Sequence, residues 1–301
     1  MGATNGALTI GAGTVNLGEL TVTNGAFTLD SGTLTNGTLS ATSYSLTNAG
    51  TISANLAGSA ALTKSGSGTA TLSGSNSYSG ATTVSAGTLT ASAAKSLSAG
   101  SAFTVGTSGA TSNRGALSIG NSLSNSVASL TLLGGNTSSA NSGSVTIGTG
   151  STLTVNGTIS YETATNNYYS ASISGGTLNL GGSTRTAAIF SNNNTADLTI
   201  SSVIANGGLN KTQTGVLQLS GSNTFTGPLQ ISAGTLALSG SGSVSNATNI
   251  SIASGATLDL TNTTAGISNG ASQTFSVAAT GGNGNTFDRL GHGQSVHVLG
   301  S

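Results

Sequence analysis

Residues 62–89 read LTKSGSGTATLSGSNSYSGATTVSAGTL, and residues 209–236 read LNKTQTGVLQLSGSNTFTGPLQISAGTL. The two stretches align without a gap, at the constant offset that separates Leu62 from Leu209 (209 − 62 = 147). About half of the aligned residues are identical. Repetition of a short unit indicates a solenoid, in which each unit buries its apolar side only by stacking on its neighbours.

Most of the remaining chain alternates short apolar–polar runs with clusters of Gly, Asn and Ser. Runs such as Leu153-Thr154-Val155 have the period of two that is typical of strands. Clusters such as Asn206-Gly207-Gly208 accept the irregular backbone of tight turns. No window combines helical spacing of apolar residues with good helix formers. The sequence therefore predicts an all-β fold with little or no helix.

We expect a parallel β-helix (β-solenoid) that is continuous over residues 1–301, with residues 270–301 as an atypical C-terminal segment. A coil of roughly 20 residues would give about 15 coils and a rod roughly 70 Å long, at a strand spacing of about 4.8 Å. The alternative is a set of β-sandwich repeats, which also use short strands at regular spacing. The lack of proline-marked hairpins and the recurring Gly-Thr-Leu element favour the solenoid.

The composition excludes several classes of function. Only 4% of residues are charged, whereas a soluble domain usually has roughly a quarter, so an enzyme is not expected. The net charge is zero, which argues against nucleic acid and anionic membranes as partners. No run approaches the roughly 18 apolar residues of a membrane helix, so we expect no membrane insertion. Without cysteine, the chain cannot form disulfides.

The doubled stretch resembles the passenger-associated transport repeat of bacterial autotransporters and related surface proteins. The resemblance rests on Leu-x-Lys-x-x-x-Gly-x-x-x-Leu-Ser-Gly-Ser-Asn-x-[Tyr/Phe]-x-Gly, closed by Ser-Ala-Gly-Thr-Leu, at residues 62–89 and 209–236. These two matches cover about a fifth of the chain. The resemblance implies a right-handed parallel β-helix that is secreted and displayed outside a Gram-negative-type cell.

The six acids are scattered and do not suggest a catalytic pair. They are spread along the chain, and no two of them are close in sequence: Glu19, Asp30, Glu162, Asp197, Asp259 and Asp288. A glycosidase would need two carboxyl groups held a few ångströms apart. We interpret all six as solvated surface charges and expect no catalytic residue.

No cofactor or metal site is predicted. His292 and His297 are the only histidines, and on a strand this spacing points them to opposite faces. Residues 281–285 lack the Asp of the calcium-binding nonapeptide repeat and are not iterated. Gly66-Ser67-Gly68 precedes a strand pattern rather than a helix, so it does not predict a phosphate site.

Two pairs of residues occupy equivalent positions in the doubled stretch. Lys64 and Lys211 are expected to lie along the surface with their stems over apolar atoms, in a structural rather than a functional role. Tyr78 and Phe225 are expected to fill or cover the wall of the solenoid rather than to stack on a sugar.

The aromatic residues concentrate at one place. Tyr161-Glu162 and Tyr168-Tyr169 bracket residues 163–167, which makes this stretch the best candidate for a protruding loop that contacts a partner. The alternative interpretation is that this stretch has no functional role.

The hypothesis from the sequence is a non-enzymatic, extracellular, structural or adhesive β-solenoid, with cell-surface or matrix glycans as candidate partners. The alternatives are a glycan-binding module or a polysaccharide-active β-helix enzyme. Ice binding ranks last, because Thr-x-Thr segments at residues 21–23, 33–35, 88–90 and 152–154 are irregularly spaced.

The two ends of the chain predict self-association. Strand-like pattern begins at Leu8-Thr9-Ile10 and continues to residues 295–299, so neither end suggests a polar cap. Zero net charge removes the repulsion between rods. A contact between unlike ends does not close, so the chain itself is an expected partner, in head-to-tail filaments.

Overall fold

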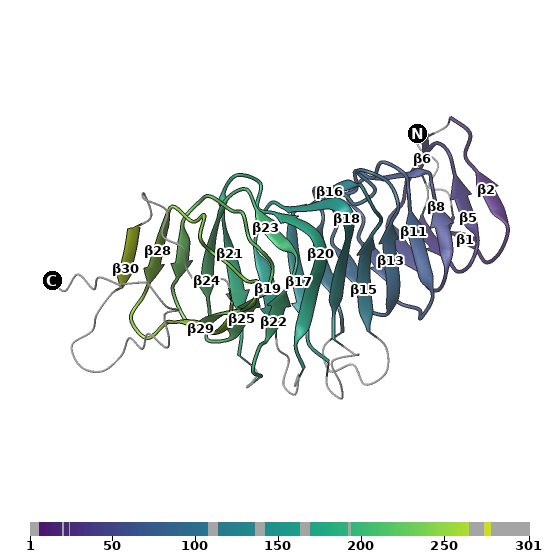
Figure 1. Cartoon of the computed structure of the whole chain (residues 1–301). Helices are drawn as coiled ribbons and strands as arrows, with labels where there is room; N and C mark the ends of the chain where they lie inside the picture. Colours follow the sequence, from purple (N-terminus) through teal and green to yellow (C-terminus); the bar gives the residue numbers. More distant parts are fainter. Residues whose placement is uncertain are drawn as a thin grey trace.

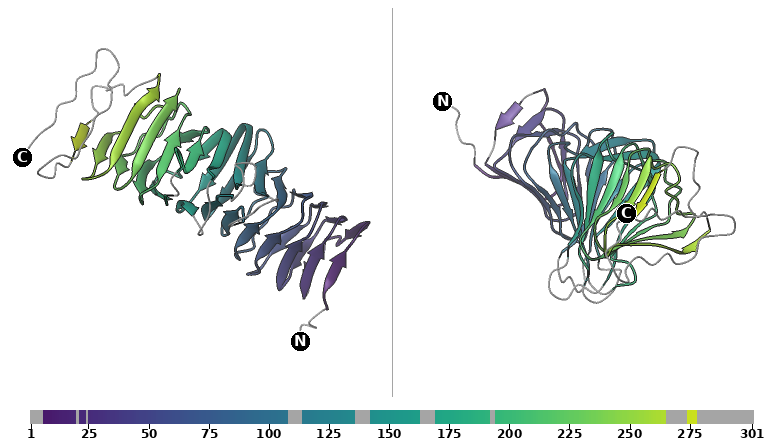
Figure 2. Two further views of the ribbon diagram at one scale, coloured as in Figure 1. Left: turned by 90° about the horizontal axis from the view of Figure 1, so that it is seen from below. Right: turned by 90° about the vertical axis from the view of Figure 1, so that its left-hand side faces the viewer.

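The computed structural model describes residues 6–19, 21–23, 25–107, 114–135, 142–162, 169–191, 194–264 and 274–277. Within these ranges all regular secondary structure is strand, arranged as an elongated stack of coils (Figures 1 and 2). None of the described residues forms a helix that is long and apolar enough to cross a membrane.

Three parallel sheets form the sides of the solenoid. The first, sheet A, has 13 strands. In spatial order they are β1 (Leu8–Ile10), β4 (Ala26–Leu29), β7 (Ser43–Leu46), β10 (Leu62–Lys64), β12 (Thr82–Val84), β14 (Ala102–Val105), β17 (Ser129–Leu133), β19 (Ile159–Glu162), β21 (Thr184–Ile189), β24 (Gly208–Thr212), β26 (Leu229–Ile231), β28 (Asn249–Ile252) and β30 (Thr274–Val277).

The second, sheet B, has 14 strands. Along its main path lie β2 (Thr14–Asn16), β5 (Thr33–Thr35), β8 (Gly50–Ile52), β11 (Thr69–Leu72), β13 (Gly87–Ala91), β15 (Gly115–Ile119), β18 (Ser144–Val155), β20 (Ala171–Asn179), β22 (Leu198–Ile200), β25 (Val216–Leu219), β27 (Thr235–Gly240) and β29 (Thr257–Thr263). Two further strands pair beside this path, β16 (Ser124–Val127) with β18 and β23 (Val203–Ala205) with β20. The third, sheet C, contains β3 (Thr21–Thr23), β6 (Thr38–Ser40) and β9 (Asn55–Ala57).

The pairing confirms the predicted parallel β-solenoid. Each strand of sheet A pairs with a strand one coil further along, as Leu62 of β10 does with Thr82 of β12. The ladders within the described residues are parallel, whereas a β-sandwich is built from antiparallel sheets, so the sandwich alternative is wrong. The handedness of the coil, the continuity of one solenoid over residues 1–301 and the atypical segment 270–301 stay predictions.

The coils are less uniform in length than the sequence predicts. The sequence offset between paired residues is 17 for Phe27 and Tyr44 (44 − 27 = 17), whereas it is 29 for Leu130 and Ile159 (159 − 130 = 29). Sheet A has one strand per coil, so the described residues make 13 coils rather than about 15. At about 4.8 Å per coil, sheet A spans roughly 60 Å instead of roughly 70 Å.

In four consecutive coils most of the extra residues lie at one corner, between the end of sheet A and the start of sheet B. Four consecutive coils have connections of eight to ten residues there, at 106–114, 134–143, 163–170 and 190–197. The coils on either side cross the same corner in two to four residues, such as 65–68 and 213–215. We call these four connections, with the sheet A residues that precede them, the extended corner.

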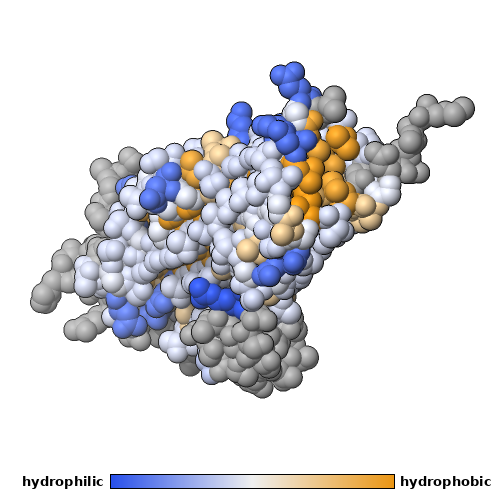
Figure 3. Space-filling view, turned by 90° about the vertical axis from the view of Figure 1, so that its right-hand side faces the viewer, coloured by the Kyte–Doolittle hydropathy of each residue, from blue (hydrophilic) through white to orange (hydrophobic). Residues whose placement is uncertain are grey.

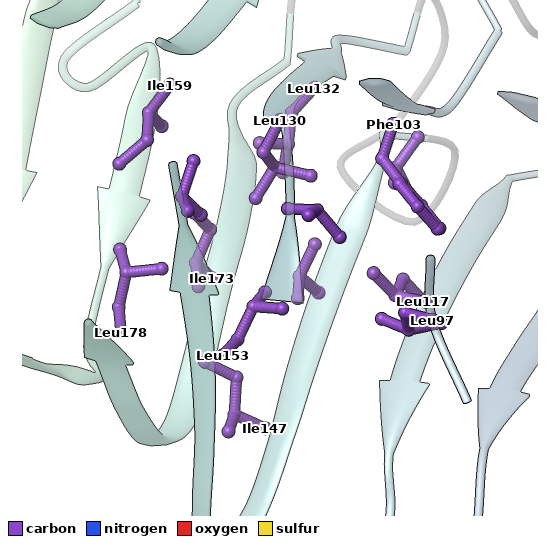
Figure 4. Packing of buried hydrophobic residues seen from close by; sticks show 14 of the residues in the cluster. Leu97, Phe103, Leu117, Leu130, Leu132, Ile147, Leu153, Ile159, Ile173 and Leu178 are labelled. Atoms are coloured by element: carbon purple, nitrogen blue, oxygen red, sulfur yellow. The ribbon is translucent and has the colours of Figure 1, made fainter. Parts of the chain in front are cut away.

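The interior is a continuous apolar core made by alternate residues of every coil. Side chains of successive coils point into the space between the sheets (Figure 4). Leu72 and Leu219 are fully buried, which confirms the register expected from the repeat, and Ser75 of the same repeat is exposed. Tyr78 and Phe225 are also buried and fill the wall as expected.

Beyond sheet C, asparagine side chains supplement the strand pairing on the third side of the solenoid. Asn76 Oδ1 accepts a hydrogen bond from Leu56 N at 2.8 Å, and its Nδ2 donates to Ser96 O at 2.6 Å. Asn223, its counterpart in the second repeat, makes the same two kinds of bond at 2.9 and 3.0 Å. These buried amides satisfy backbone groups that have no strand partner.

The N-terminal coil has a partly open axial face. Leu8, Val15 and Val22 pack against the core but are only partly buried. Figure 3 views this end of the molecule and shows apolar residues gathered on part of it. β1, β2 and β3 are the first strands of their sheets within the described residues, so each pairs on one side only.

Candidate interaction surface

Lys64 does not lie along the surface as expected. Its side chain is fully buried, at the inward register position between Leu46 and Val84 of the neighbouring coils. The ammonium group donates to the carbonyl oxygen of Gly66 and, at 3.3 Å, to that of Ala86. A lysine can occupy this core position because turn carbonyls of its own coil and the next receive its charge.

Lys211 repeats this arrangement, so the expected surface position is wrong for both lysines. Its Nζ donates to Thr212 O at 2.9 Å, Gln213 O at 2.8 Å and Ala233 O at 3.0 Å. Burial lowers the pKa of Lys211 to about 8, and the nearby carboxylate of Asp197 partly opposes that shift. Burial also lowers the pKa of Lys64.

The glycine of each Ser-Ala-Gly-Thr-Leu element packs directly on the lysine turn of the preceding coil. Gly87 and Gly234 have φ of 65° and 66°, a conformation that favours glycine. A Cβ at Gly234 would lie 2.8 Å from Lys211 Nζ and 2.6 Å from Gly215 O. The lysine, asparagine and glycine of the repeat signature therefore act together in holding one coil on the next.

The acids differ in their surroundings. Asp197 is fully buried, and its Oδ2 accepts a hydrogen bond from Val216 N at 2.8 Å, so the expectation of a solvated surface charge is wrong for this residue. Glu19, Asp30 and Glu162 are exposed, as expected, and Asp259 is half-buried.

The structure adds no candidate for metal binding in the part that it describes. Those residues contain no group of three His, Asp or Glu side chains that could hold an ion. Asp288, His292 and His297 lie outside the described residues, so their expected roles stay predictions.

The aromatic concentration near residue 161 belongs to the extended corner. Tyr161 is fully buried and its hydroxyl donates to Tyr169 O at 3.1 Å, so this ring packs in the core and does not protrude. Glu162 is exposed and Tyr169 is half-buried. Residues 163–168, which include Tyr168, lie outside the described residues, and the predicted protruding loop stays a prediction.

Sequence reasoning missed Phe190, which is the large hydrophobic side chain exposed among the described residues, at 40%. Tyr161 pairs with Ile189 in sheet A, and Phe190 N donates to Tyr161 O at 3.1 Å. Phe190 therefore lies beside Glu162 on adjacent coils, at the end of sheet A. The sequence alone gives no signal for it, because the length of the connection that Phe190 begins is known only once the strands are paired.

The described residues of the extended corner place apolar rings close to a hydrogen-bond acceptor. Phe190 presents an apolar ring face to solvent, and Glu162 presents a carboxylate that can accept hydrogen bonds. Tyr169 adds a half-buried ring from the connection that follows Glu162. Sugars combine apolar ring faces with hydroxyl donors, so this combination suits a glycan.

The flat faces of the solenoid present hydroxyl groups instead. The four Thr-x-Thr segments do not form one array, because 33–35 and 88–90 lie in sheet B, 21–23 in sheet C and 152–154 in the second half of β18. Paired residues nevertheless form two ladders of eight hydroxyl side chains: in sheet A, Thr9, Thr28, Ser45, Thr63, Thr83, Thr104, Thr131 and Ser160; in sheet B, Thr14, Thr33, Thr51, Thr71, Thr90, Ser118, Thr146 and Ser174.

Comparison with known proteins agrees with this architecture. Residues 62–91 and 209–238 match the Passenger-associated-transport-repeat family. The Adhesin BmaC autotransporter of Brucella suis biovar 1 (strain 1330) is 40% identical over 144 residues, which are 47% of this chain and 4% of that protein. The chain thus spans only a small part of the length of this relative. No solved structure matches the chain. The chain carries two passenger-associated transport repeats, and both comparisons indicate a surface-exposed or secreted protein of a Gram-negative bacterium.

Proposed function

We propose that this chain is a non-enzymatic, adhesive segment of an autotransporter passenger, and that it contacts glycans through the extended corner. The proposal rests on the exposed Phe190 beside Glu162. The two residues lie on adjacent coils within a run of four whose connections are two or more times longer than those around them. The similarity to an adhesin supports the adhesive role.

The chemistry of the corner supports binding rather than hydrolysis. A glycosidase pairs an acid with a second carboxylate across the scissile bond. Glu162 is exposed, whereas Asp197, the other acid of this corner, is buried and bound to a backbone amide. A carboxylate held in this way is a structural hydrogen-bond acceptor.

The adhesive proposal predicts that Phe190→Ala lowers glycan binding about five- to tenfold, because an exposed ring that stacks on a sugar contributes on the order of 1 kcal/mol. Binding to an array of neutral and acidic glycans measures this effect. Thr63→Ala, on the flat face of sheet A, is the matched control and should bind like the parent chain. Equal binding by Phe190→Ala would rule out the corner as the contact surface.

A second candidate function is end-to-end self-association into fibres. The partly open N-terminal face and the one-sided pairing of β1 and β2 support it, because unpaired edges accept further strands. In such a contact β1 and β2 of one copy would add to the far ends of sheets A and B of the next copy. Sheet C ends after three coils, so the edge of β3 would gain no strand within the described residues.

Sedimentation velocity of the 301-residue chain at rising concentration tests this second function. We expect oligomers that grow with concentration, and we expect Val15→Asp to abolish them by placing a charge on the apolar face. Thr9→Asp, on an exposed position of the same coil, should still assemble. A strictly monomeric parent chain at high micromolar concentration would refute self-association and leave the solenoid untouched.

A further inference from the structure

A polar corner lies where the third side of the solenoid turns into sheet A. Three successive coils pass it at Asn156, at residues 179–183 and at Asn206. Asn179 Oδ1 accepts hydrogen bonds from Gly181 N at 2.7 Å and from Asn206 Nδ2 at 3.3 Å. Asn156, Gly181 and Asn206 are exposed, so this ordered turn is accessible from solvent.

Arg185 places a guanidinium group at this corner. Its Nε donates to Leu180 O at 2.8 Å, which fixes the plane of the group against the turn. The four N–H groups of Nη1 and Nη2 have no acceptor among the described residues, and no carboxylate of the described chain pairs with them. The side chain is half-buried, so part of its donor set is presented to solvent in a defined orientation.

Gly181 leaves the guanidinium uncovered. A Cβ on Gly181 would lie 3.0 Å from Arg185 Nη2 and 3.5 Å from Asn156 Oδ1. Any side chain at this position would therefore crowd both groups. Gly181 and Gly182 also have positive φ, 65° and 73°, a conformation that favours glycine.

We propose that Arg185 binds the carboxylate of an acidic sugar, with the amide of Asn156 and Oδ1 of Asn206 available to the neighbouring hydroxyls. A planar guanidinium with parallel free donors matches a carboxylate in a bidentate pair. Almost all of the surrounding surface is uncharged, since only 4% of the residues are charged, so this cation has little competition from internal partners. The site is separate from the extended corner and does not rest on it.

Binding of an oligogalacturonate and of its methyl ester, measured by calorimetry, tests the proposal. The acid should bind the parent chain more tightly than the ester, because esterification removes the charge. Arg185→Gln should weaken binding of the acid about tenfold or more, since charge-assisted bonds contribute about 1.5–3 kcal/mol. Lys95→Gln removes an exposed charge elsewhere and should bind the acid like the parent chain.

Two further measurements distinguish a loss of binding from a loss of folding, and a carboxylate ligand from a sulfate ligand. Asn156→Ala, at an exposed side chain, should weaken binding of the acid while leaving thermal unfolding unchanged. Equal binding of acid and ester, equal binding by Arg185→Gln, or binding only of a sulfated polysaccharide would overturn the proposal. If Phe190→Ala leaves glycan binding unchanged while Arg185→Gln weakens binding of the acid, the adhesive role of the extended corner is refuted and the Arg185 site is retained.

Discussion

At the residue scale, the transport repeat is a set of interlocking coil contacts. Lys64 and Lys211 carry their charge into the core and deliver it to turn carbonyls, and the glycines of the following coil lie on those turns. Sequence reasoning found the repeat but placed the lysines on the surface, because a buried lysine is rare unless it is paired. The carbonyls that pair with it come partly from the next coil, which spacing alone does not reveal.

The buried Lys211 predicts an unusual dependence of stability on pH. Its pKa is lowered by burial from 10.5 to about 8, so between these values the unfolded chain binds more protons than the folded chain. The free energy of unfolding should therefore rise with pH above about 8. Above pH 10 the trend should reverse, because burial raises the pKa of Tyr44 and Tyr78 above the usual 10.0.

Denaturant unfolding at pH 7.5, 8.5 and 9.5 checks this prediction. Lys211→Met should be less stable at all three values, because turn carbonyls lose their donor, and its stability should depend less on pH. A parent chain whose stability falls over this range, or a variant with an unchanged slope, would contradict the assignment.

At the element scale, the strands could be predicted from the sequence, whereas the lengths of the connections between them could not. Apolar–polar alternation in runs such as Leu153-Thr154-Val155 identifies strands, because the side chains of one face must reach the core. Coil length carries no such signal, since a longer connection at a corner leaves the strand pattern on each side intact. The extended corner, and with it the exposed position of Phe190, therefore emerged only when the strands were paired.

The asparagines of the third side have a testable role at this scale. Asn76→Ala would leave Leu56 N and Ser96 O without partners, at a cost of about 1–3 kcal/mol for each group. Denaturant unfolding should show this loss, whereas the adjacent exposed Ser75→Ala should unfold like the parent chain. Unchanged stability of Asn76→Ala would mean that strand-like pairing, not the amide, holds this side.

At the scale of the whole molecule, the residues that stabilise the solenoid are different from those that we propose bind a partner. The core runs through every described coil, while the flat sides carry hydroxyl ladders and almost no charge. In the described part of the chain, the exposed Phe190 ring and the Arg185 guanidinium both lie at corners, where a connection can lengthen without disturbing the ladders. The adhesive surface that we propose uses this freedom, as does the arginine corner.

Disulfide cross-linking tests whether parallel coils of unequal length are stacked in the described register. The chain has no cysteine, so an introduced pair has no competitor. Thr104 pairs with Thr131 of the next coil, and both side chains point outward on neighbouring strands. Adjacent strands lie about 4.8 Å apart, which is within the Cα–Cα range of a disulfide.

Mass spectrometry after mild oxidation should show a cross-link in the Thr104→Cys/Thr131→Cys chain. It should show none in the Thr104→Cys/Ser124→Cys chain, whose shorter spacing would fit uniform coils of roughly 20 residues. A cross-link in the second pair, or none in the first, would contradict the pairing of β14 with β17 and the unequal coil lengths that follow from it.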